Sequence, residues 1–371
     1  MKVGVPTEIK AQESRVGLTP ASVQELVNYG HEVIIQDNAG FNAGFENSDY
    51  EKKGAKIAPS SSDIFNDAEM IVKVKEPLNE EVSMLRENQI LFTYLHLSAA
   101  PDLTKGLINS KSICIAYETV TDENNRLPLL APMSAVAGRM SIQAGARSLE
   151  KPLGGRGLLL GGAPGVNPAT VLILGGGVVG ENAAIIASGM QANVFIVDKS
   201  EARLNELKSQ FGENITTLLS DEIKLEEYVT QCDLLIGGVL IPGANAPKLV
   251  SKEMIKEMKR GSVVVDVAID QGGCVETSKP TTHANPPYII DDVVHYCVAN
   301  MPGGVPMTST LALNAATLPF VLKLAKEGYK NALSSDANFL AGLNVCVGNV
   351  TYKAVADDLG LEFVDPIKAI N

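Results

Sequence analysis

The stretch that decides the fold is VLILGGGVVG, residues 171–180. Its first four residues are apolar and typical of a buried strand, and Gly175, Gly177 and Gly180 follow at G-x-G-x-x-G spacing. The first glycine permits a tight turn, the second lets a pyrophosphate approach the backbone, and the third lets the next helix lie close to the strand. A helical stretch at 181–190 then offers unpaired N–H groups to phosphates. This run predicts the first βα unit of a Rossmann-type sheet that binds a dinucleotide.

The next strand candidate, NVFIVD, ends in an acid at the position that this fingerprint requires. Asp198 lies 23 residues beyond Gly175. A carboxylate there accepts hydrogen bonds from a ribose 2′-hydroxyl and repels a 2′-phosphate, which favours NAD over NADP. Lys199 and Arg203 lie nearby and weaken that preference. A glycine turn beside a surface aspartate is the alternative, but strand, glycines, helix and acid all fall at the expected spacing.

Short apolar runs alternate with helical patterns on both sides of this unit, which is typical of mostly parallel sheets covered by helices. The strand candidates are residues 2–5, 32–36, 70–75, 89–95, 112–117, 171–174, 193–197, 233–237, 262–269 and 295–299. Helices are predicted from Thr19-Pro20 to about Gly30, and at 61–68, 101–109 and 131–151. A second glycine-rich run, 154–165, has no acid-ended strand after it and is interpreted as a connecting loop.

The helical segment after residue 307 follows the last strand candidate, so we expect it to return to the first sheet. The sequence therefore predicts an α/β protein of two domains. A doubly wound Rossmann domain that binds NAD(H), residues 129–306, is inserted into a discontinuous α/β substrate domain, residues 1–128 plus 307–371.

Composition excludes several classes of protein. Against 31 Lys and Arg stand 43 Asp and Glu, a net charge of −12, and no basic run occurs, so nucleic acid is not expected as a partner. The five cysteines are odd in number and show no CxxC spacing, which argues against a disulfide framework and a zinc site. Neither a signal peptide nor a membrane span is visible. We expect a soluble, cytoplasmic protein that binds no metal and no membrane.

Hydride transfer from a carbon that bears nitrogen or oxygen needs a cation for the substrate carboxylate and groups that move protons. Of the four histidines, His96 is the best candidate because it follows the strand candidate 89–95, and imidazole exchanges protons near neutral pH. His31 is interpreted as a surface residue, and His283 and His295 as structural ones.

Two cations also follow strand candidates in the first domain. Arg15 lies in the loop after the first strand, and Lys75 ends the run MIVKVK. Arg suits bidentate recognition of a carboxylate, and Lys supplies a point charge. Lys73 competes with Lys75 but lies deeper in its strand, and a surface ion pair is the alternative for each of these cations.

In the second domain, three strand candidates end in residues that suit a bound dinucleotide. They are followed by Val239 and Leu240, by Asp270, and by Asn300 and Met301. Asp266 lies inside its strand and is interpreted as structural.

From end to end the chain resembles the alanine dehydrogenase family. The matching segments are VGVPTEIKAQESRVGLTP, VKVKEP, TYLHLS, VLILGGGVVGENAA, VVVDVAIDQGG and VANMPGGVPMTSTLALNAATLP. The Arg15 segment is shared more loosely with saccharopine dehydrogenase and with the NAD(H)-binding subunit of proton-translocating transhydrogenase. Cys346 or Tyr352 stands where the family often carries His, so no metal site is carried over.

The resemblance implies NAD-dependent oxidative deamination of L-alanine to pyruvate and ammonium by a homohexamer. It implies that Arg15 and Lys75 hold the substrate carboxylate, with Tyr94 and Asn300 also at the substrate. His96 would be the general acid–base, and Asp270 would assist the water or carbinolamine step. The implied cofactor site consists of Ser134, Gly175, Gly177, Val178, Val179, Gly180, Asp198, Arg203, Ser220, Val239, Leu240, Val267, Asp270, Asn300 and Met301.

Two other functions stay open at this point. A transhydrogenase subunit would need a docking surface for an NADP domain, and the run after Pro132 lacks the Arg–Gln–Asp loop pattern associated with that subunit. A redox sensor would bind NADH without turnover, which a full set of substrate-site charges disfavours.

Overall fold

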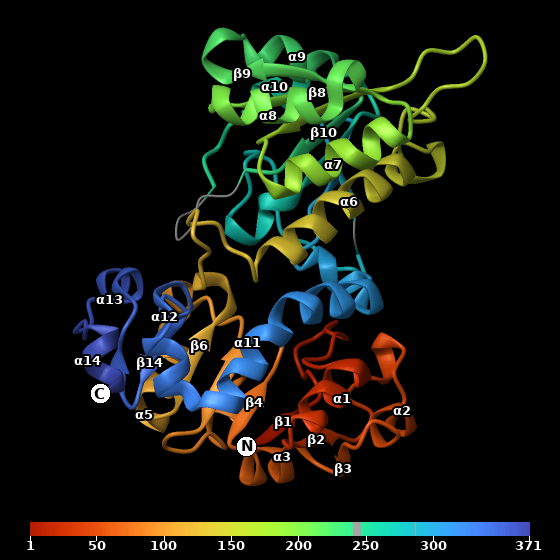
Figure 1. Cartoon of the computed structure of the whole chain (residues 1–371). Coiled ribbons are helices and arrows are strands. Elements are labelled where there is room, and N and C mark those ends of the chain that lie inside the picture. Colours follow the sequence, from red (N-terminus) through yellow and green to blue (C-terminus); the bar gives the residue numbers. More distant parts are fainter. Residues whose placement is uncertain (240–245, 286) are drawn as a thin grey trace. The chain divides into compact units, whose positions relative to one another are not determined.

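The structure is a computed structural model that describes residues 1–239, 246–285 and 287–371. It divides into two compact units, which Figure 1 shows with their elements labelled. Unit 1 comprises Met1–Pro132 and Val305–Asn371, and unit 2 comprises Met133–Gly304. The two-unit α/β architecture agrees with the predicted fold class, whereas the assignment of residues 1–128 plus 307–371 to substrate and 129–306 to NAD stays a prediction.

Unit 1 contains one eight-stranded sheet in the order β15-β14-β6-β5-β4-β1-β2-β3. Its strands are β1 (Lys2–Val5), β2 (Glu32–Gln36), β3 (Lys56–Ala58), β4 (Met70–Val72), β5 (Ile90–Thr93), β6 (Ile113–Ala116), β14 (Leu343–Cys346) and β15 (Asn349–Val350). The strands from β3 to β6 are parallel, and β14 and β15 pair antiparallel at one edge. The chain winds outward in both directions from β1, so the order reverses between β1 and β4. Ligands of open parallel sheets bind at such a switch point.

The helices of unit 1 begin where the sequence supplies caps. At α1 the Thr19 hydroxyl accepts a hydrogen bond from the Ser22 N–H, and Pro20 occupies the first helical position. The α-helices are α1 (Pro20–Asn28), α2 (Asn47–Glu51), α3 (Ser61–Asp67), α4 (Asn79–Val82), α5 (Pro101–Ser110), α11 (Pro306–Ser334), α12 (Ala337–Leu340), α13 (Lys353–Leu359) and α14 (Pro366–Ile370). Short 3₁₀ turns are η1 (Phe41–Ala43), η2 (Leu97–Ala99) and η3 (Tyr117–Thr119).

Helix α11 holds the loop that follows β1. The Asn314 side-chain oxygen accepts from the Thr19 N–H at 2.9 Å, and its amide donates to the Gly17 carbonyl. One turn earlier, the Thr310 hydroxyl accepts from the Val16 N–H at 3.2 Å. These side chains are buried, so the bonds replace lost contacts with water. A Cβ on Gly17 would lie 2.4 Å from the carbonyl oxygen of Val72, which shows how closely this loop approaches β4.

Among its described residues, unit 2 contains a seven-stranded sheet in the order β12-β13-β11-β10-β7-β8-β9. Its strands are β7 (Thr170–Leu174), β8 (Asn193–Asp198), β9 (Thr216–Leu219), β10 (Leu234–Gly237), β11 (Val263–Asp266), β12 (Pro287–Ile290) and β13 (Val293–Tyr296). All pair in parallel except β12. The order reverses between β7 and β10, which is the Rossmann winding that the glycine fingerprint predicted.

The α-helices of unit 2 are α6 (Ala131–Ser148), which begins in the last residues of unit 1, α7 (Val178–Gly189), α8 (Glu201–Phe211), α9 (Leu225–Gln231) and α10 (Lys252–Glu257). The 3₁₀ turns are η4 (Lys151–Leu153), η5 (Gly212–Asn214), η6 (Ser220–Glu222), η7 (Val267–Gln271) and η8 (Met301–Gly304). All five cysteines are buried and free. Within the described parts of the chain, no helix is both long and apolar enough to cross a membrane.

Several predicted strands are too long. A strand is predicted at 70–75, but β4 ends at Val72. A strand is predicted at 89–95, but β5 ends at Thr93. His96 has φ 51°, a left-handed conformation that a strand cannot contain. The prediction for 262–269 ends at Asp266, because the chain turns there into η7.

A substitution at Gly180 tests how closely helix α7 packs against the turn that follows β7. A Cβ on Gly180 would lie 1.8 Å from the carbonyl oxygen of Gly175, whereas a Cβ on Gly189 of the same helix would meet nothing within 4 Å. We expect Gly180→Ala to lower the free energy of unfolding by about 1–3 kcal/mol or more. Gly189→Ala is the control and should raise it by up to about 1 kcal/mol, since alanine favours the helix. Urea denaturation followed by circular dichroism measures both, and equal effects would contradict this packing.

Candidate functional site

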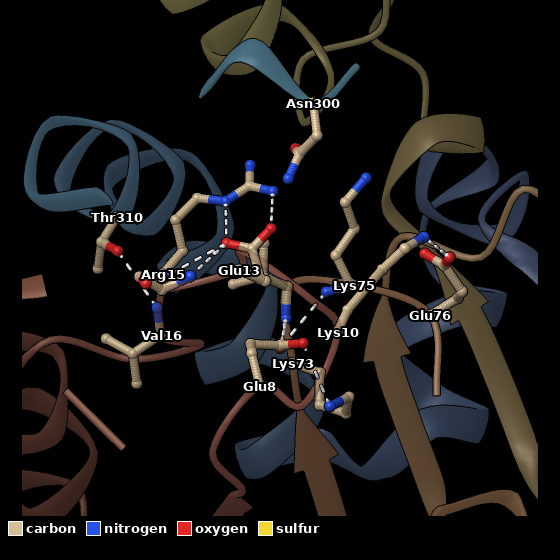
Figure 2. Close-up of polar contacts among 12 residues, drawn as sticks. Glu8, Lys10, Glu13, Arg15, Val16, Lys73, Lys75, Glu76, Asn300 and Thr310 are labelled. Atoms are coloured by element: carbon tan, nitrogen blue, oxygen red, sulfur yellow. Dashed lines mark hydrogen bonds and ion pairs between the residues drawn. The ribbon is translucent and has the colours of Figure 1, made fainter. Parts of the chain in front are cut away.

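In unit 1, the predicted substrate residues follow three adjacent parallel strands. Arg15 lies in the loop after β1, Lys75 lies three residues beyond β4, and His96 lies three residues beyond β5. Because β1, β4 and β5 are neighbours in the sheet, their carboxyl ends bring these loops together. Figure 2 shows the side chains of Arg15 and Lys75 extending from these loops on the same side, away from the strands.

Arg15 is held by the carboxylate of Glu13. Glu13 Oε1 accepts from Arg15 Nε at 2.7 Å, and Glu13 Oε2 accepts from Arg15 Nη2 (Figure 2). The side chains of Arg15 and Glu13 are 2% and 0% exposed. Burial opposes the charge of the guanidinium, but the bonds and charge of Glu13 outweigh it, so the pKa of Arg15 is raised. Arg15 therefore stays charged at every working pH.

The backbone of Lys75 is held on both sides. Glu8 Oε1 accepts from the Val74 N–H at 2.6 Å and lies 3.4 Å from the Lys75 nitrogen. The Thr93 hydroxyl donates to the Lys75 carbonyl at 2.9 Å. These bonds fix the backbone from which the side chain of Lys75 extends. Lys75 itself is half-buried.

Lys73, which competes with Lys75 as the predicted substrate cation, is buried and paired within the protein. Its side chain is fully buried, with Nζ 2.6 Å from Glu81 Oε1 and 3.3 Å from Glu8 Oε2. Burial raises the pKa of Glu8, although the charge of Lys73 opposes this. Burial alone would discharge Lys73, but Glu8 and Glu81 raise its pKa instead. Lys73 thus serves as the counter-charge of the carboxylate that holds the Lys75 segment.

His96 lies at the start of η2 with its ring half-exposed. Its backbone N–H donates to Glu118 Oε1 at 2.6 Å, and its Nδ1 lies 3.7 Å from the same oxygen. The imidazole stacks parallel to the ring of Tyr94, with centroids 5.9 Å apart. The Tyr94 hydroxyl donates to the Leu129 carbonyl at 2.6 Å, and burial raises its pKa. Tyr94 therefore presents a neutral ring that lies parallel to the imidazole of His96.

The glycine turn of unit 2 is joined to Asp198. Asp198 Oδ2 accepts from the Gly176 N–H at 2.6 Å, and Oδ1 accepts from the Ser200 N–H at 2.8 Å. A Cβ on Gly177 would meet nothing within 4 Å, so the backbone there is open to a close ligand. Both features fit a dinucleotide whose pyrophosphate lies on the turn and whose ribose lies at Asp198.

Arg203 is more constrained than its position in the sequence suggests. Its Nε donates to the Gly176 carbonyl at 2.7 Å, and its guanidinium forms ion pairs with Glu181 and Glu206. These two carboxylates compensate its charge. Arg203 therefore supports the glycine turn. Because its charge is already paired, we expect it to attract a 2′-phosphate less, and so to weaken the predicted preference for NAD less, than the sequence suggests.

Most of the other predicted cofactor residues also follow the carboxyl ends of strands in the unit 2 sheet. Ser220 follows β9, Val239 follows β10, Val267 and Asp270 lie in η7 after β11, and Asn300 and Met301 follow β13. Val178 and Val179 begin α7. Ser134 is the fourth residue of α6. Leu240 lies outside the described residues.

Asp270 and Asn300 are bonded to each other. The Asn300 N–H points at both carboxylate oxygens of Asp270, at 3.2 and 3.3 Å, and Asn300 has φ 56°. His283 Nε2 lies 3.3 Å from the Asn300 carbonyl, so a histidine interpreted as structural supports this turn. Asp266 accepts from the N–H groups of Cys274 and Val275, which agrees with its structural interpretation.

Sequence reasoning missed the carboxylates that hold the cations and the histidine. Glu8 and Glu13 were not distinguished from other acids in their loop, and Glu118 was not selected. Glu118 follows β6, the next strand beside β5, so the rule that located His96 could also have found it. Among the described residues, no group of three or more His, Cys, Asp or Glu side chains could hold a metal ion.

Both parts of the chain match one family. Residues 4–137 match "Alanine dehydrogenase/PNT, N-terminal domain", and residues 141–353 match "Alanine dehydrogenase/PNT, C-terminal domain". Over its full length, the chain is 57% identical to an alanine dehydrogenase of Halomonas elongata, with 100% of both chains covered. It is 53% identical to an alanine dehydrogenase of Bacillus subtilis, covering 100% of this chain and 98% of the relative.

Solved structures give the same relationship. A structure described as L-alanine dehydrogenase is 52% identical, with a TM-score of 0.94 over 97% of this chain and 99% of that one. A transhydrogenase structure from Sinorhizobium meliloti is 23% identical, with a TM-score of 0.83 over 95% of this chain and 100% of that one. At that identity the second likeness is one of fold alone.

A substitution of Lys73 tests the buried triad that it forms with Glu8 and Glu81. Lys73→Met would leave Glu8 and Glu81 buried without their cation, and we expect it to lower the free energy of unfolding by about 3–5 kcal/mol. Lys56→Met is the matched control, since Lys56 pairs with Glu32 in an exposed position and should cost at most about 1 kcal/mol. Denaturation in urea at neutral pH measures both. Equal losses would show that the buried triad contributes no more than a surface pair.

Proposed function

Because the chain belongs to the alanine dehydrogenase/PNT family, we propose that it catalyses the NAD-dependent oxidative deamination of L-alanine to pyruvate and ammonium, and the reverse reaction. One observation carries this proposal: Arg15, Lys75 and His96 follow three adjacent strands of unit 1. Two cations and one imidazole are the groups that an amino acid requires, for its carboxylate and for its departing protons.

The two cations contribute differently to binding the substrate. A guanidinium offers up to five N–H donors in a plane and can bind a carboxylate through two parallel bonds. An ammonium is a compact charge on a flexible stem. In the proposed complex, Arg15 determines the orientation of the alanine carboxylate and Lys75 adds charge.

Proton transfer is assigned to His96 and Asp270. When bound, NAD would supply the acceptor for the hydride that leaves Cα of alanine. The amine must lose protons as the C–N double bond forms, and His96 is proposed to take them; Glu118 lies 3.7 Å from its Nδ1. Water must then add to the imine carbon before ammonia leaves, and Asp270 is proposed to assist this step.

The cofactor is proposed to lie on the switch point of the unit 2 sheet. Its pyrophosphate would lie on the Gly175–Gly180 turn, at the N-terminus of α7, and its adenosine ribose at Asp198. The carboxylate of Asp198 supports NAD over NADP. Ser220, Val239 and Met301 would line the remainder of the site. Leu240 keeps its proposed place there from the sequence alone.

From membership of this family, we also propose that the protein is a homohexamer that works in the cytoplasm. Analytical ultracentrifugation of the purified protein checks the assembly, and a monomer at micromolar concentration would contradict it.

The reaction itself has a direct test. We expect the protein to raise the absorbance of NADH when it is mixed with L-alanine and NAD at alkaline pH, where loss of protons favours deamination. Glycine and L-serine are the comparison substrates, and pyruvate with ammonium and NADH tests the reverse direction. No turnover with any of these substrates, with tight NADH binding, would indicate a sensor instead.

His96→Ala tests the assigned proton transfer. We expect kcat to fall by about 10²- to 10⁴-fold, the usual contribution of a general acid–base, while the Kd for NADH stays within about twofold. His31→Ala is the control, because His31 lies outside this group of loops and should leave kcat unchanged. A loss of NADH binding in His96→Ala would show that His96 has another role.

Asp198→Ser tests the preference for NAD. Removing the carboxylate takes away a charged acceptor for the ribose and a repulsion against the 2′-phosphate, so the ratio of kcat/KM for NAD to that for NADP should fall about ten- to hundredfold. Glu201→Gln, on the exposed first turn of α8, is the control. An unchanged ratio would remove Asp198 from the ribose site.

A further inference from the structure

The carboxylate of Glu13 accepts several hydrogen bonds from the two residues that follow it. Its Oε1 accepts from Arg15 Nε at 2.7 Å, from the Arg15 backbone N–H at 3.0 Å and from the Ser14 N–H at 3.2 Å. Its Oε2 accepts from Arg15 Nη2. One carboxylate therefore binds both the backbone and the side chain of Arg15 (Figure 2).

This arrangement leaves the guanidinium little freedom. A long arginine side chain loses much rotamer entropy when it is ordered, and two bonds from Nε and Nη2 to one carboxylate fix the plane of the fork. The backbone bond from the same residue fixes where that fork begins. The cost of ordering Arg15 is therefore met in the protein alone, before any ligand binds.

The charges lead to the same conclusion. Arg15 and Glu13 are both almost completely buried, and a buried guanidinium without a counter-charge would be costly. Together they carry no net charge. The attraction that draws in a carboxylate then depends on Lys75, whereas Arg15 provides direction.

We propose that Glu13 is a positioning residue of the substrate site: it holds the Arg15 guanidinium in the orientation that receives the substrate carboxylate. This inference rests on the proposed function, because it needs Arg15 to bind that carboxylate. Glu13 acts through Arg15 and does not touch the reacting atoms.

The alternative is that Glu13 only stabilises the loop. A double-mutant cycle separates the two, because a residue that acts through Arg15 can have no effect on substrate binding once Arg15 is removed. The variants are Glu13→Gln, Arg15→Gln and the double variant. Glutamine keeps the shape of Glu13, but its amide would meet the Nη2 donor.

We expect Glu13→Gln to raise KM for both L-alanine and pyruvate about ten- to hundredfold, the factor for a lost bond to a charged group. The value of kcat should change less than about threefold, and the Kd for NADH should stay unchanged. Arg15→Gln should raise KM at least as much, and the double variant should match Arg15→Gln within about threefold. Glu13→Asp, which keeps the charge but retracts it, should lie between wild type and Glu13→Gln.

Glu32→Gln is the control for removal of a carboxylate, since Glu32 pairs with Lys56 at an exposed position. Its KM should equal that of wild type. The inference would be overturned if the effects of Glu13→Gln and Arg15→Gln on KM multiplied in the double variant. It would also be overturned if Glu13→Gln lost kcat and NADH binding together with a lowered melting temperature. If Glu13→Gln does not fold, a wild-type KM in Glu13→Asp would equally overturn it. An inactive wild-type protein would instead refute the proposed function.

Discussion

The loops that carry the proposed substrate residues of unit 1 depend on one buried ammonium, that of Lys73. Lys73 lies between Glu8 and Glu81 with no exposed surface, and Glu8 uses its other oxygen to bind the backbone of Val74. Without that cation, the carboxylate that holds the Lys75 segment would be buried and unpaired. A fully buried charge thereby determines the backbone position of Lys75, the cation proposed to bind the substrate carboxylate.

The same principle recurs around each functional side chain. Arg15 is oriented by Glu13, His96 is held by Glu118 and Tyr94, and Asp198 is bonded to the glycine turn that it serves. Each functional group is thus ordered by a partner from the same or an adjacent loop. In the proposed reaction, binding energy that would otherwise order these groups would remain for catalysis.

The sheets of the two units share one pattern of strand order. In each, the described residues form six parallel strands that wind outward from a first strand, β1 in unit 1 and β7 in unit 2. The predicted residues follow the strands around each point of reversal, where neighbouring loops diverge and leave room for a ligand. In unit 1 those loops carry cations and an imidazole, and in unit 2 they carry glycines and an acid. The chemistry therefore differs through the loops, while the scaffolds share their order.

The sequence by itself determined the α/β class, the glycine turn with Asp198 and the positions of Arg15, Lys75 and His96, because these depend on local spacing and on residues that follow strands. It did not predict β14, whose antiparallel pairing with β6 joins segments more than two hundred residues apart, or β15, which pairs with β14. Nor did it select Glu8, Glu13 or Glu118 from the 43 acidic residues. An acid is recognised as a partner only when folding buries it beside a cation or an N–H group, and burial of that kind is decided by tertiary structure.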